Sequence, residues 1–266
     1  MRYLVKISYD GTGFIGWQKQ KRGRSVQSVM ENALAEFCGK PTSLVAAGRT
    51  DTGVHALAQY AHFEYEGRMN LNQILLAFRR WLPDDVKVLQ IWQVSDALSA
   101  RYQAYERQYL YILSKDRDPF NRQYSGYIPH LKVSLKPMQD AAERLLGKHN
   151  FSSFGRLNPE VPNHFCEIYE LSITETEDSF HFMVRADRFL HNMVRRIVGT
   201  LVNIAHFDLP PNTIDRLLAD ECPRQNLVTT APAEGLYLIG VKYPAELLDG
   251  RDTLKFDETR RGKHGL

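Results

Sequence analysis

The chain has 266 residues, of which 43% are apolar and 24% are charged, and its formal net charge is +3. This composition is typical of a folded globular protein and excludes a disordered or fibrous one. The N-terminal segment MRYLVKISYDGTG lacks the long apolar region of a signal peptide, and no stretch approaches the roughly 18 apolar residues of a membrane span. The three cysteines are far apart and imply no disulfide framework. We therefore expect a cytoplasmic protein without a membrane segment.

The first hundred residues alternate between predicted strands and predicted helices. Alternating or continuous apolar runs rich in β-branched and aromatic residues predict strands, and apolar spacings of three and four predict amphipathic helices. A helix in SVQSVMENALAEFCG has Ser25 as a plausible cap and Gly39 as its stop. The predicted order is strand YLVKISY, helix SVQSVMENALAEFCG, strands SLVAA and AQYAHFEY, helix LNQILLAFRRWL and strand VKVLQIWQV.

A similar order follows in the rest of the chain. It reads strand QYLYILS, helix SLKPMQDAAERLLG, strands CEIYELSITET and FHFMVRA, helix FLHNMVRRIVGTLVNIA and strand GLYLIGVKY. The sequence therefore predicts an α+β fold with two related halves, residues 1–100 and 101–245, each a mainly antiparallel sheet with helices packed on one face. Residues 246–266 are charged and weakly patterned, which predicts a C-terminal tail.

Two motifs that suggest cofactors lack the context they need. GTGFIG at residues 11–16 has the spelling of a dinucleotide-binding loop, but no helical periodicity begins at its last glycine. The histidines and cysteines do not form a zinc-binding pattern, and the chain has no phosphate-binding loop and no obvious serine hydrolase triad. We expect neither a nucleotide cofactor nor a metal.

The most polar short loop, GRTDTG at residues 48–53, separates two apolar segments. It is either a hairpin loop, in which Asp51 accepts backbone hydrogen bonds, or a site. A guanidinium close to Asp51, such as that of Arg49, would keep its carboxylate ionised and oriented. An ionised carboxylate can act as a nucleophile or as a base, and flanking glycines let a large substrate come close to the backbone.

Basic residues gather in several short clusters, although the net charge is small. KQKRGR at residues 19–24 carries four cations, and Arg79–Arg80 and Arg195–Arg196 are adjacent pairs. Each cluster alone is explained by a solvated face. Because aromatic residues flank several of them, the distribution moderately favours a polyanionic partner.

Several blocks together resemble the family of tRNA pseudouridine synthases of the TruA type. In order along the chain they are YDGTGFIGWQKQ, SVQSVMENAL, AAGRTDTGVHALAQ, WLPDDV, ARYQAYERQYLYIL, LLGKHNFSSF, FLHNMVRRIVGTL and EGLYLIGVKYP. The resemblance covers roughly residues 3–244. It implies isomerisation of uridine to pseudouridine in tRNA, in a catalytic cleft between the halves and without any cofactor.

By this resemblance Asp51 is the catalytic aspartate. It would either attack the ribose C1′ or remove a C2′ proton, and the sequence does not decide between these routes. Tyr109 matches the family tyrosine that stacks on the uracil and could help to take the C5 proton, although a core-facing sheet residue would look the same. Tyr111, two positions on, is predicted to share its face as packing.

Two further residues are assigned partly on their own pattern. On a helical wheel Arg195 lies at the border of an apolar stripe, while Arg196 points further toward solvent. A border arginine can place its guanidinium in a cleft, and the resemblance makes Arg195 the partner of Asp51. Leu236 matches the apolar residue beneath the base, and it also fits an ordinary core strand.

RNA contacts are implied for the residues just before Asp51. Arg49 and Thr50 are expected to bind the substrate, with Arg49 reaching into the duplex to help displace the target nucleotide. Arg101 and the basic clusters would follow phosphates. Arg79 and Ser99 depart from the family pattern. These departures put local RNA contacts in doubt, and they do not affect the residues proposed for the reaction.

The resemblance further implies a tRNA partner, modification of positions 38, 39 and 40 in the anticodon stem-loop, and a homodimer. Two alternatives stay open at this point. One is a pseudouridine synthase with a different RNA target, and the other is a non-catalytic RNA-binding protein that uses the same cleft. A nucleotide-dependent enzyme is the weakest alternative.

Overall fold

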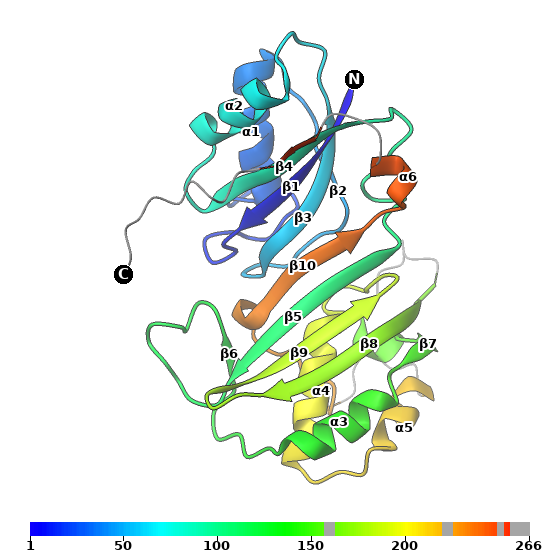
Figure 1. Ribbon diagram of the computed structural model, residues 1–266. Helices are drawn as coiled ribbons and strands as arrows, with labels where there is room; N and C mark the ends of the chain where they lie inside the picture. The colour runs from blue at the N-terminus through cyan, green and yellow to red at the C-terminus, as the bar shows by residue number, and fades with distance from the viewer. Residues whose placement is uncertain (157–162, 220–225, 249–252, 256–266) are drawn as a thin grey trace.

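The structure is a computed structural model that describes residues 1–156, 163–219, 226–248 and 253–255. In these residues a single mixed sheet carries helices mainly on one face (Figure 1). The strands are β1 Arg2–Tyr9, β2 Val45–Ala46, β3 His55–Glu64, β4 Val86–Val94, β5 Glu106–Ser114, β6 Gly126–Tyr127, β7 Gly147–Asn150, β8 Phe165–Glu175, β9 Ser179–Ala186, β10 Leu236–Lys242 and β11 Thr253–Lys255. The α-helices are α1 Val26–Cys38, α2 Leu71–Trp81, α3 Leu135–Glu143, α4 Met193–His206, α5 Thr213–Ala219 and α6 Ala245–Leu248.

The same strand arrangement occurs twice along the sheet, whose path runs β11-β4-β1-β3-β10-β5-β9-β8-β7. In the N-terminal part β4, β1, β3 and β2 are successive neighbours, and in the C-terminal part β10, β5, β9 and β8 are. Most neighbours are antiparallel, whereas β3 and β10 are parallel where the two arrangements meet. The α+β class and the two related layouts that the sequence predicts are thereby confirmed.

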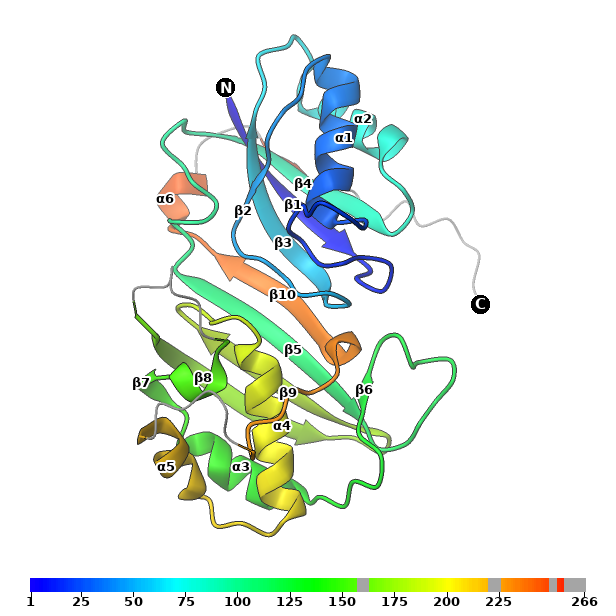
Figure 2. The same cartoon turned by 180° about the vertical axis from the view of Figure 1, so that it is seen from behind.

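The two main helices, α1 and α4, lie on the same face of the sheet, one over each part (Figure 2). Ser25 caps α1 in a reciprocal pair with Ser28, and Gly39 ends the helix in the left-handed conformation. α4 begins at Met193 and not at Phe189, because Asn192 has φ 64° and cannot belong to the helix. The start of this helix is predicted four residues too early, and the end of the preceding predicted helix, residues 134–147, lies beyond Glu143, where α3 ends.

A hydrophobic cluster fills each part of the molecule between helices and sheet. Ile7, Met30 and Phe78 belong to the first, and Phe182 and Ile197 belong to the second. All five side chains are fully buried. Because each cluster is a packed interior of its own, the two parts meet mainly through β10 and the residues around it.

Adjacent leucines on α2 offer a test of this packing. Leu75 is 5% exposed and Leu76 is 58% exposed. We expect Leu75→Ala to lower the free energy of unfolding by about 2–5 kcal/mol, because it removes buried methyl groups and leaves a cavity. Leu76→Ala, the matched control, should change it by less than about 0.5 kcal/mol. Urea denaturation followed by circular dichroism measures both, and equal losses would contradict the burial described here.

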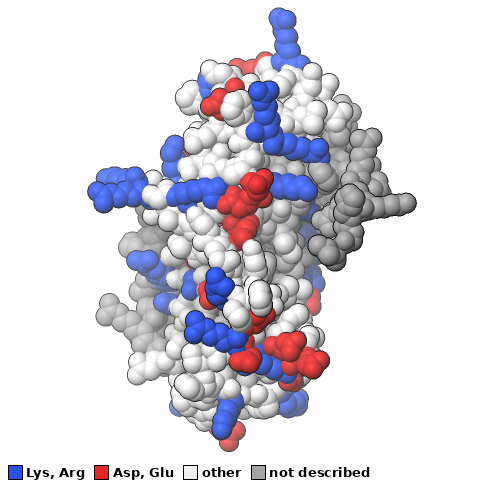
Figure 3. Space-filling model, turned by 90° about the vertical axis from the view of Figure 1, so that its left-hand side faces the viewer, with Lys and Arg blue, Asp and Glu red and all other residues white. Residues whose placement is uncertain are grey.

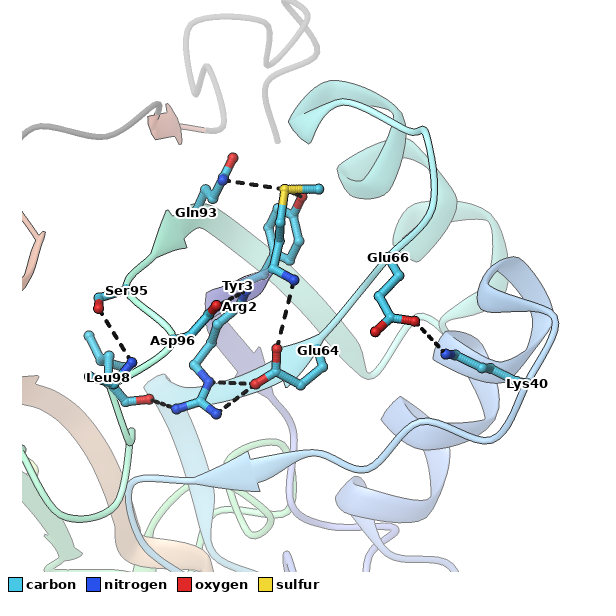
Figure 4. Close-up of polar contacts among 11 residues, drawn as sticks. Arg2, Tyr3, Lys40, Glu64, Glu66, Gln93, Ser95, Asp96 and Leu98 are labelled. Atoms are coloured by element: carbon cyan, nitrogen blue, oxygen red, sulfur yellow. Dashed lines mark hydrogen bonds and ion pairs between the residues drawn. The ribbon is translucent and has the colours of Figure 1, made fainter.

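Two parts of the region expected to be a C-terminal tail carry regular structure. Residues 245–248 form α6, and residues 253–255 form β11, which pairs with Gln90–Trp92 of β4. The remaining residues of that region, 249–252 and 256–266, lie outside the described ones. At the other end of the chain, Arg2 binds Glu64 on β3 and the carbonyl of Leu98 (Figure 4).

An ionic cluster ties three neighbouring strands together. Glu106 on β5 is 4% exposed and accepts two hydrogen bonds from Arg185 on β9, at 2.9 and 3.0 Å. Lys242 on β10 lies 3.0 Å from the same carboxylate. These donors, Arg185 first, lower the pKa of Glu106 to about 2.

The depressed pKa of Glu106 predicts a specific pH dependence. Its contribution to stability is complete above the ordinary glutamate pKa of 4.5 and is lost as the pH falls through about 2. Glu106→Gln should therefore destabilise the protein near neutral pH and flatten the stability curve across this acidic window. Glu66→Gln, which removes an exposed pair with Lys40 (Figure 4), should have little effect. Chemical denaturation at several pH values distinguishes the two variants, and parallel curves for Glu106→Gln and wild type would contradict the assignment.

Candidate active site

The loop that carries Asp51 joins β2 to β3 and rests on the segment 10–17 that follows β1. The backbone N–H of Trp17 donates to the carbonyl of Thr50 at 3.0 Å, and that of Gly53 donates to the carbonyl of Phe14. Gly16 has φ 99°, and a Cβ there would lie 2.6 Å from the Thr50 carbonyl oxygen. A Cβ on Gly11 would lie 2.1 Å from the carbonyl oxygen of Val54. The glycines of GTGFIG thus let two loops pack backbone against backbone, and this packing positions Asp51.

Thr50 is held beneath this loop. Its side chain is buried, and its hydroxyl lies 2.8 Å from the Tyr9 hydroxyl. Burial raises the pKa of Tyr9 to about 12, so the phenol stays neutral. Thr50 also lines the groove in front of the loop. The Thr50 side chain therefore anchors the loop, and Thr50 also forms part of the groove wall.

The Asp51 carboxylate meets two basic side chains, one from the turn that precedes α4 and one from the first turn of α4. Nη1 of Arg195 lies 3.6 Å from Oδ2, and Nε2 of His191 lies 3.0 Å from Oδ1. Arg195 is fixed in turn, because its Nε donates to the carbonyl of Ala231 at 2.7 Å and its Nη1 lies 3.3 Å from Oδ1 of Asn192. The structure thus brings Asp51 and Arg195 together from opposite sides of the junction.

Arg196 is placed differently from the prediction. Its side chain is partly buried and donates to the carbonyl of Gly155 at 2.7 Å, instead of pointing toward solvent. Burial lowers its pKa, and the nearby Arg156 contributes to the shift. The helical wheel misplaced Arg196 because the segment 152–156 covers this side of α4, and a wheel contains no information about neighbouring segments.

Tyr109 and Leu236 lie next to this acid–base cluster. Tyr109 on β5 pairs with Leu238 on β10, and its ring meets that of Phe189 edge-on at 5.2 Å. Burial first, and then the charges of neighbouring Tyr9 and Asp51, raise the pKa of Tyr109. Leu236 is 5% exposed and lines the same groove.

Tyr111 is a core residue, in contrast to Tyr109. It is fully buried and its hydroxyl donates to the carbonyl of Pro232 at 2.9 Å. It does not belong to the residues that line the groove. The packing role predicted for it agrees with this position.

A groove of about 1600 Å³ opens above Asp51, between the two parts of the molecule. It is lined by backbone and side chains from both, and among the described residues its charged lining is strongly biased. The arginines are Arg49, Arg101, Arg107, Arg156, Arg188 and Arg195, and the carboxylates are Asp51 and Asp187. Six guanidinium groups against two carboxylates create a positive field that favours a polyanion.

Arg107 braces the floor of the groove across the junction. Its guanidinium donates to the carbonyls of Ala47, Arg101, Ala104 and Asp187. Burial lowers its pKa, and the four carbonyls occupy its donors. It therefore acts as a brace between segments 47–51 and 101–109, with few donors left for a ligand.

The predicted cationic residues are only partly brought together. Arg49 and Arg101 are exposed in the groove lining, whereas Arg79 and Arg80 lie in the last turn of α2 and outside that lining. In the basic run after β1, Arg24 binds Asp85 through two hydrogen bonds and Lys19 lies 3.5 Å from Glu31. Figure 3, which views the molecule from the left of Figure 1, shows Lys and Arg side chains spread over that face with Asp and Glu gathered among them.

The comparison with known proteins adds to this geometry. A sequence model described as tRNA pseudouridine synthase matches residues 6–103 and 141–244. The chain belongs to the tRNA pseudouridine synthase family.

Relatives in this family are similar over nearly their whole length. The chain is 38% identical to tRNA pseudouridine synthase A of Bacteroides fragilis, over 93% of this chain and 98% of the relative. It is 40% identical to tRNA pseudouridine synthase A of Nitrosomonas eutropha, over 92% and 88%. A solved H/ACA RNP bound to a substrate RNA containing 2′-deoxyuridine aligns with TM-score 0.37 and 11% identity, over 91% of this chain and 50% of that one. That likeness is too remote to add to the assignment.

Within this member of the tRNA pseudouridine synthase family, sequence reasoning missed two features of the site. The glycine motif at residues 11–16 was weighed as a dinucleotide-binding loop, and its support of the Asp51 loop was not foreseen. His191 received no role from the sequence, because nothing in its pattern indicated a contact with Asp51. The helix period could have placed His191 and Arg195 near each other, but the partner 140 positions away carries no local signal.

The described part of the chain lacks two features that would change the interpretation of the site. No helix there is both long and apolar enough to cross a membrane. No group of three or more His, Cys, Asp or Glu side chains there is arranged to hold a metal ion.

Proposed function

We propose that this protein isomerises uridine to pseudouridine in tRNA with Asp51 as the catalytic carboxylate. The observation that carries the proposal is the pairing of Asp51 with Arg195, 3.6 Å apart, at the base of a groove lined by six arginines. A carboxylate beside a fixed guanidinium stays ionised at neutral pH. An ionised carboxylate in a groove for a polyanion is the arrangement that base isomerisation on RNA needs.

The reaction breaks the bond between ribose C1′ and uracil N1 and joins C1′ to C5 after the base has rotated. Asp51 either attacks C1′ to form a covalent intermediate or removes the C2′ proton to give a glycal. The C5 proton is then released to a base. Both routes transfer atoms within one nucleotide, so they consume no redox partner or group donor, and we propose that no cofactor takes part.

Tyr109 and Leu236 would hold the uracil during its rotation. Stacking of a base on an aromatic ring contributes roughly 1–3 kcal/mol. The raised pKa of Tyr109 keeps its phenol neutral, and a neutral phenol is a poor proton acceptor. Stacking is therefore the role that the geometry favours for Tyr109, with Leu236 as the apolar surface beneath the base.

The substrate we propose is the anticodon stem-loop of tRNA, with modification at positions 38, 39 and 40. The groove is much larger than one nucleotide, and its six arginines suit a folded segment of RNA. Exposed Arg49, two residues before Asp51, would enter the duplex as the target nucleotide is displaced. We further propose that the protein works as a homodimer in the cytoplasm.

The test is release of tritium from tRNA transcribed with 5-tritiated uridine, since bond formation at C5 expels that tritium. The tRNA is folded beforehand and the assay contains a chelator. We expect release by the purified protein and modification mapped to positions 38–40. Release with modification elsewhere would favour another RNA target. Tight tRNA binding without release would favour a non-catalytic RNA-binding protein.

A further inference from the structure

His191 is the partner of Asp51 that the proposed function leaves without a role. We propose that His191 is a positioning residue. It fixes the orientation of the Asp51 carboxylate through a hydrogen bond from the Nε2 of His191, and this inference rests on the proposed function. Because an ionised carboxylate can only accept, Nε2 carries the hydrogen and donates it to Oδ1 over 3.0 Å. The side chain is 48% exposed in the groove, so substrate and imidazole share the same space.

A rigid turn presents His191 to the carboxylate. The backbone N–H of Met193 donates to the carbonyl of Leu190 at 3.1 Å, so residues 190–193 form a turn with His191 at its second position. Asn192, at the third position, has φ 64° and ψ 2°, close to the values of a type II turn. The carbonyl of His191 accepts a hydrogen bond from the backbone N–H of Arg156 at 3.0 Å. The backbone on both sides of the imidazole is thus fixed.

Arg195 and His191 make different kinds of contact with the Asp51 carboxylate. The distance from Arg195 to Oδ2, 3.6 Å, fits an ion pair and exceeds that of a good hydrogen bond. Its donors are directed to Ala231 and Asn192, at 2.7 and 3.3 Å. Arg195 therefore supplies charge, while His191 supplies the short directional contact that stops rotation of the carboxylate. A fixed carboxylate spends more time in the geometry that leads to reaction.

The neighbours of His191 set the background for any pH effect. Besides Asp51, the charged groups that share the groove lining with it include Arg195, Arg156 and Arg188, and the titratable ones include Tyr109, Asp187 and His164. The arginines remain charged at every working pH, and burial keeps Tyr109 neutral. Because Asp187 and His164 share the groove, kcat and its recovery in a variant that keeps an N–H donor report on the Asp51–His191 contact more specifically than a pH profile does.

The experiment compares His191→Phe with His191→Gln in the tritium-release assay, at saturating and subsaturating prefolded tRNA and between pH 5 and 9. Phenylalanine keeps a ring without a donor, and glutamine keeps an N–H donor at similar reach. We expect His191→Phe to lower kcat by roughly 10- to 100-fold, the worth of one hydrogen bond to a charged group, with KM within about threefold. His191→Gln should recover most of kcat. His206→Gln at the exposed end of α4 is the matched control.

Three outcomes would overturn the inference. Wild-type kcat in His191→Phe would make the contact incidental. A raised KM with unchanged kcat would assign His191 to RNA binding instead. Failure of glutamine to restore kcat in a variant with wild-type thermal stability would remove the hydrogen bond as the cause. Wild type and Asp51→Ala are measured in parallel, so inactivity of wild type, or activity of Asp51→Ala, would refute the proposed function rather than this inference.

Discussion

Replacing Asp51 with alanine is expected to abolish tritium release from 5-tritiated tRNA, with a loss in kcat of at least roughly four orders of magnitude. The reason is that every step proposed here begins at this carboxylate. The other carboxylate of the described groove lining, Asp187, accepts hydrogen bonds from the backbone N–H groups of Glu167 and Arg188. Binding of tRNA should change little, because the arginines that line the groove remain. A filter-binding assay beside the release assay separates these two effects.

The control for Asp51 is Asp85→Asn. Asp85 is also partly exposed and paired with an arginine, Arg24, but lies outside the groove lining. We expect this variant to release tritium at the wild-type rate. Release by Asp51→Ala at more than a few percent of wild type would mean that the reaction belongs to another residue. Loss of tRNA binding together with activity would mean that the loop at 48–53 mainly binds RNA.

The second large effect is expected for Arg195→Met, which should lower kcat by roughly 10²- to 10³-fold with little change in tRNA affinity. Methionine replaces the aliphatic stem of arginine but has no guanidinium group, so it leaves Asp51 without its fixed positive charge. The substitution also removes the hydrogen bond to the carbonyl of Ala231, so thermal stability must be measured alongside activity. A modest fall in the melting temperature is compatible with the prediction.

Two further variants make the interpretation of Arg195 specific. Arg195→Lys keeps a positive charge but cannot reach Asp51, Asn192 and the Ala231 carbonyl together, so we expect partial activity. Arg196→Met removes the bond to Gly155 and should affect stability more than kcat. Wild-type turnover in Arg195→Met would remove this arginine from the site.

Much of the secondary structure could be predicted from the sequence, because it depends on local patterns. The caps of α1, Ser25 and Gly39, are recognisable from the residues next to the helix. α2 ends at Trp81, two residues before Pro83, whose ring cannot continue a helix. The boundary of α4 failed because the left-handed backbone of Asn192 is imposed by a turn that depends on tertiary contacts. The short strands β6 and β7 were missed because two and four residues are too few to show an alternating pattern.

The site could be predicted in its residues and much less in its contacts. The resemblance named Asp51 and Arg195, and the wheel placed Arg195 near a cleft. Neither could show that His191 lies 3.0 Å from Asp51, or that the guanidinium of Arg107 donates its hydrogen bonds to backbone carbonyls. Such contacts join residues that are far apart in the chain, and their distances depend on how two separately packed parts meet.

The position of β10 has a consequence for synthesis on the ribosome. This strand pairs with β3 and with β5, and yet it comes from residues 236–242. A nascent chain that ends before residue 236 can complete most of both cores, but it lacks the strand that joins the Asp51 side of the groove to the Arg195 side. Non-local closure of this kind is slow and comes late in folding. Catalytic competence should therefore arise in one step, only after residues 236–242 have been synthesised, which prevents shorter nascent chains from acting on the RNA that surrounds them.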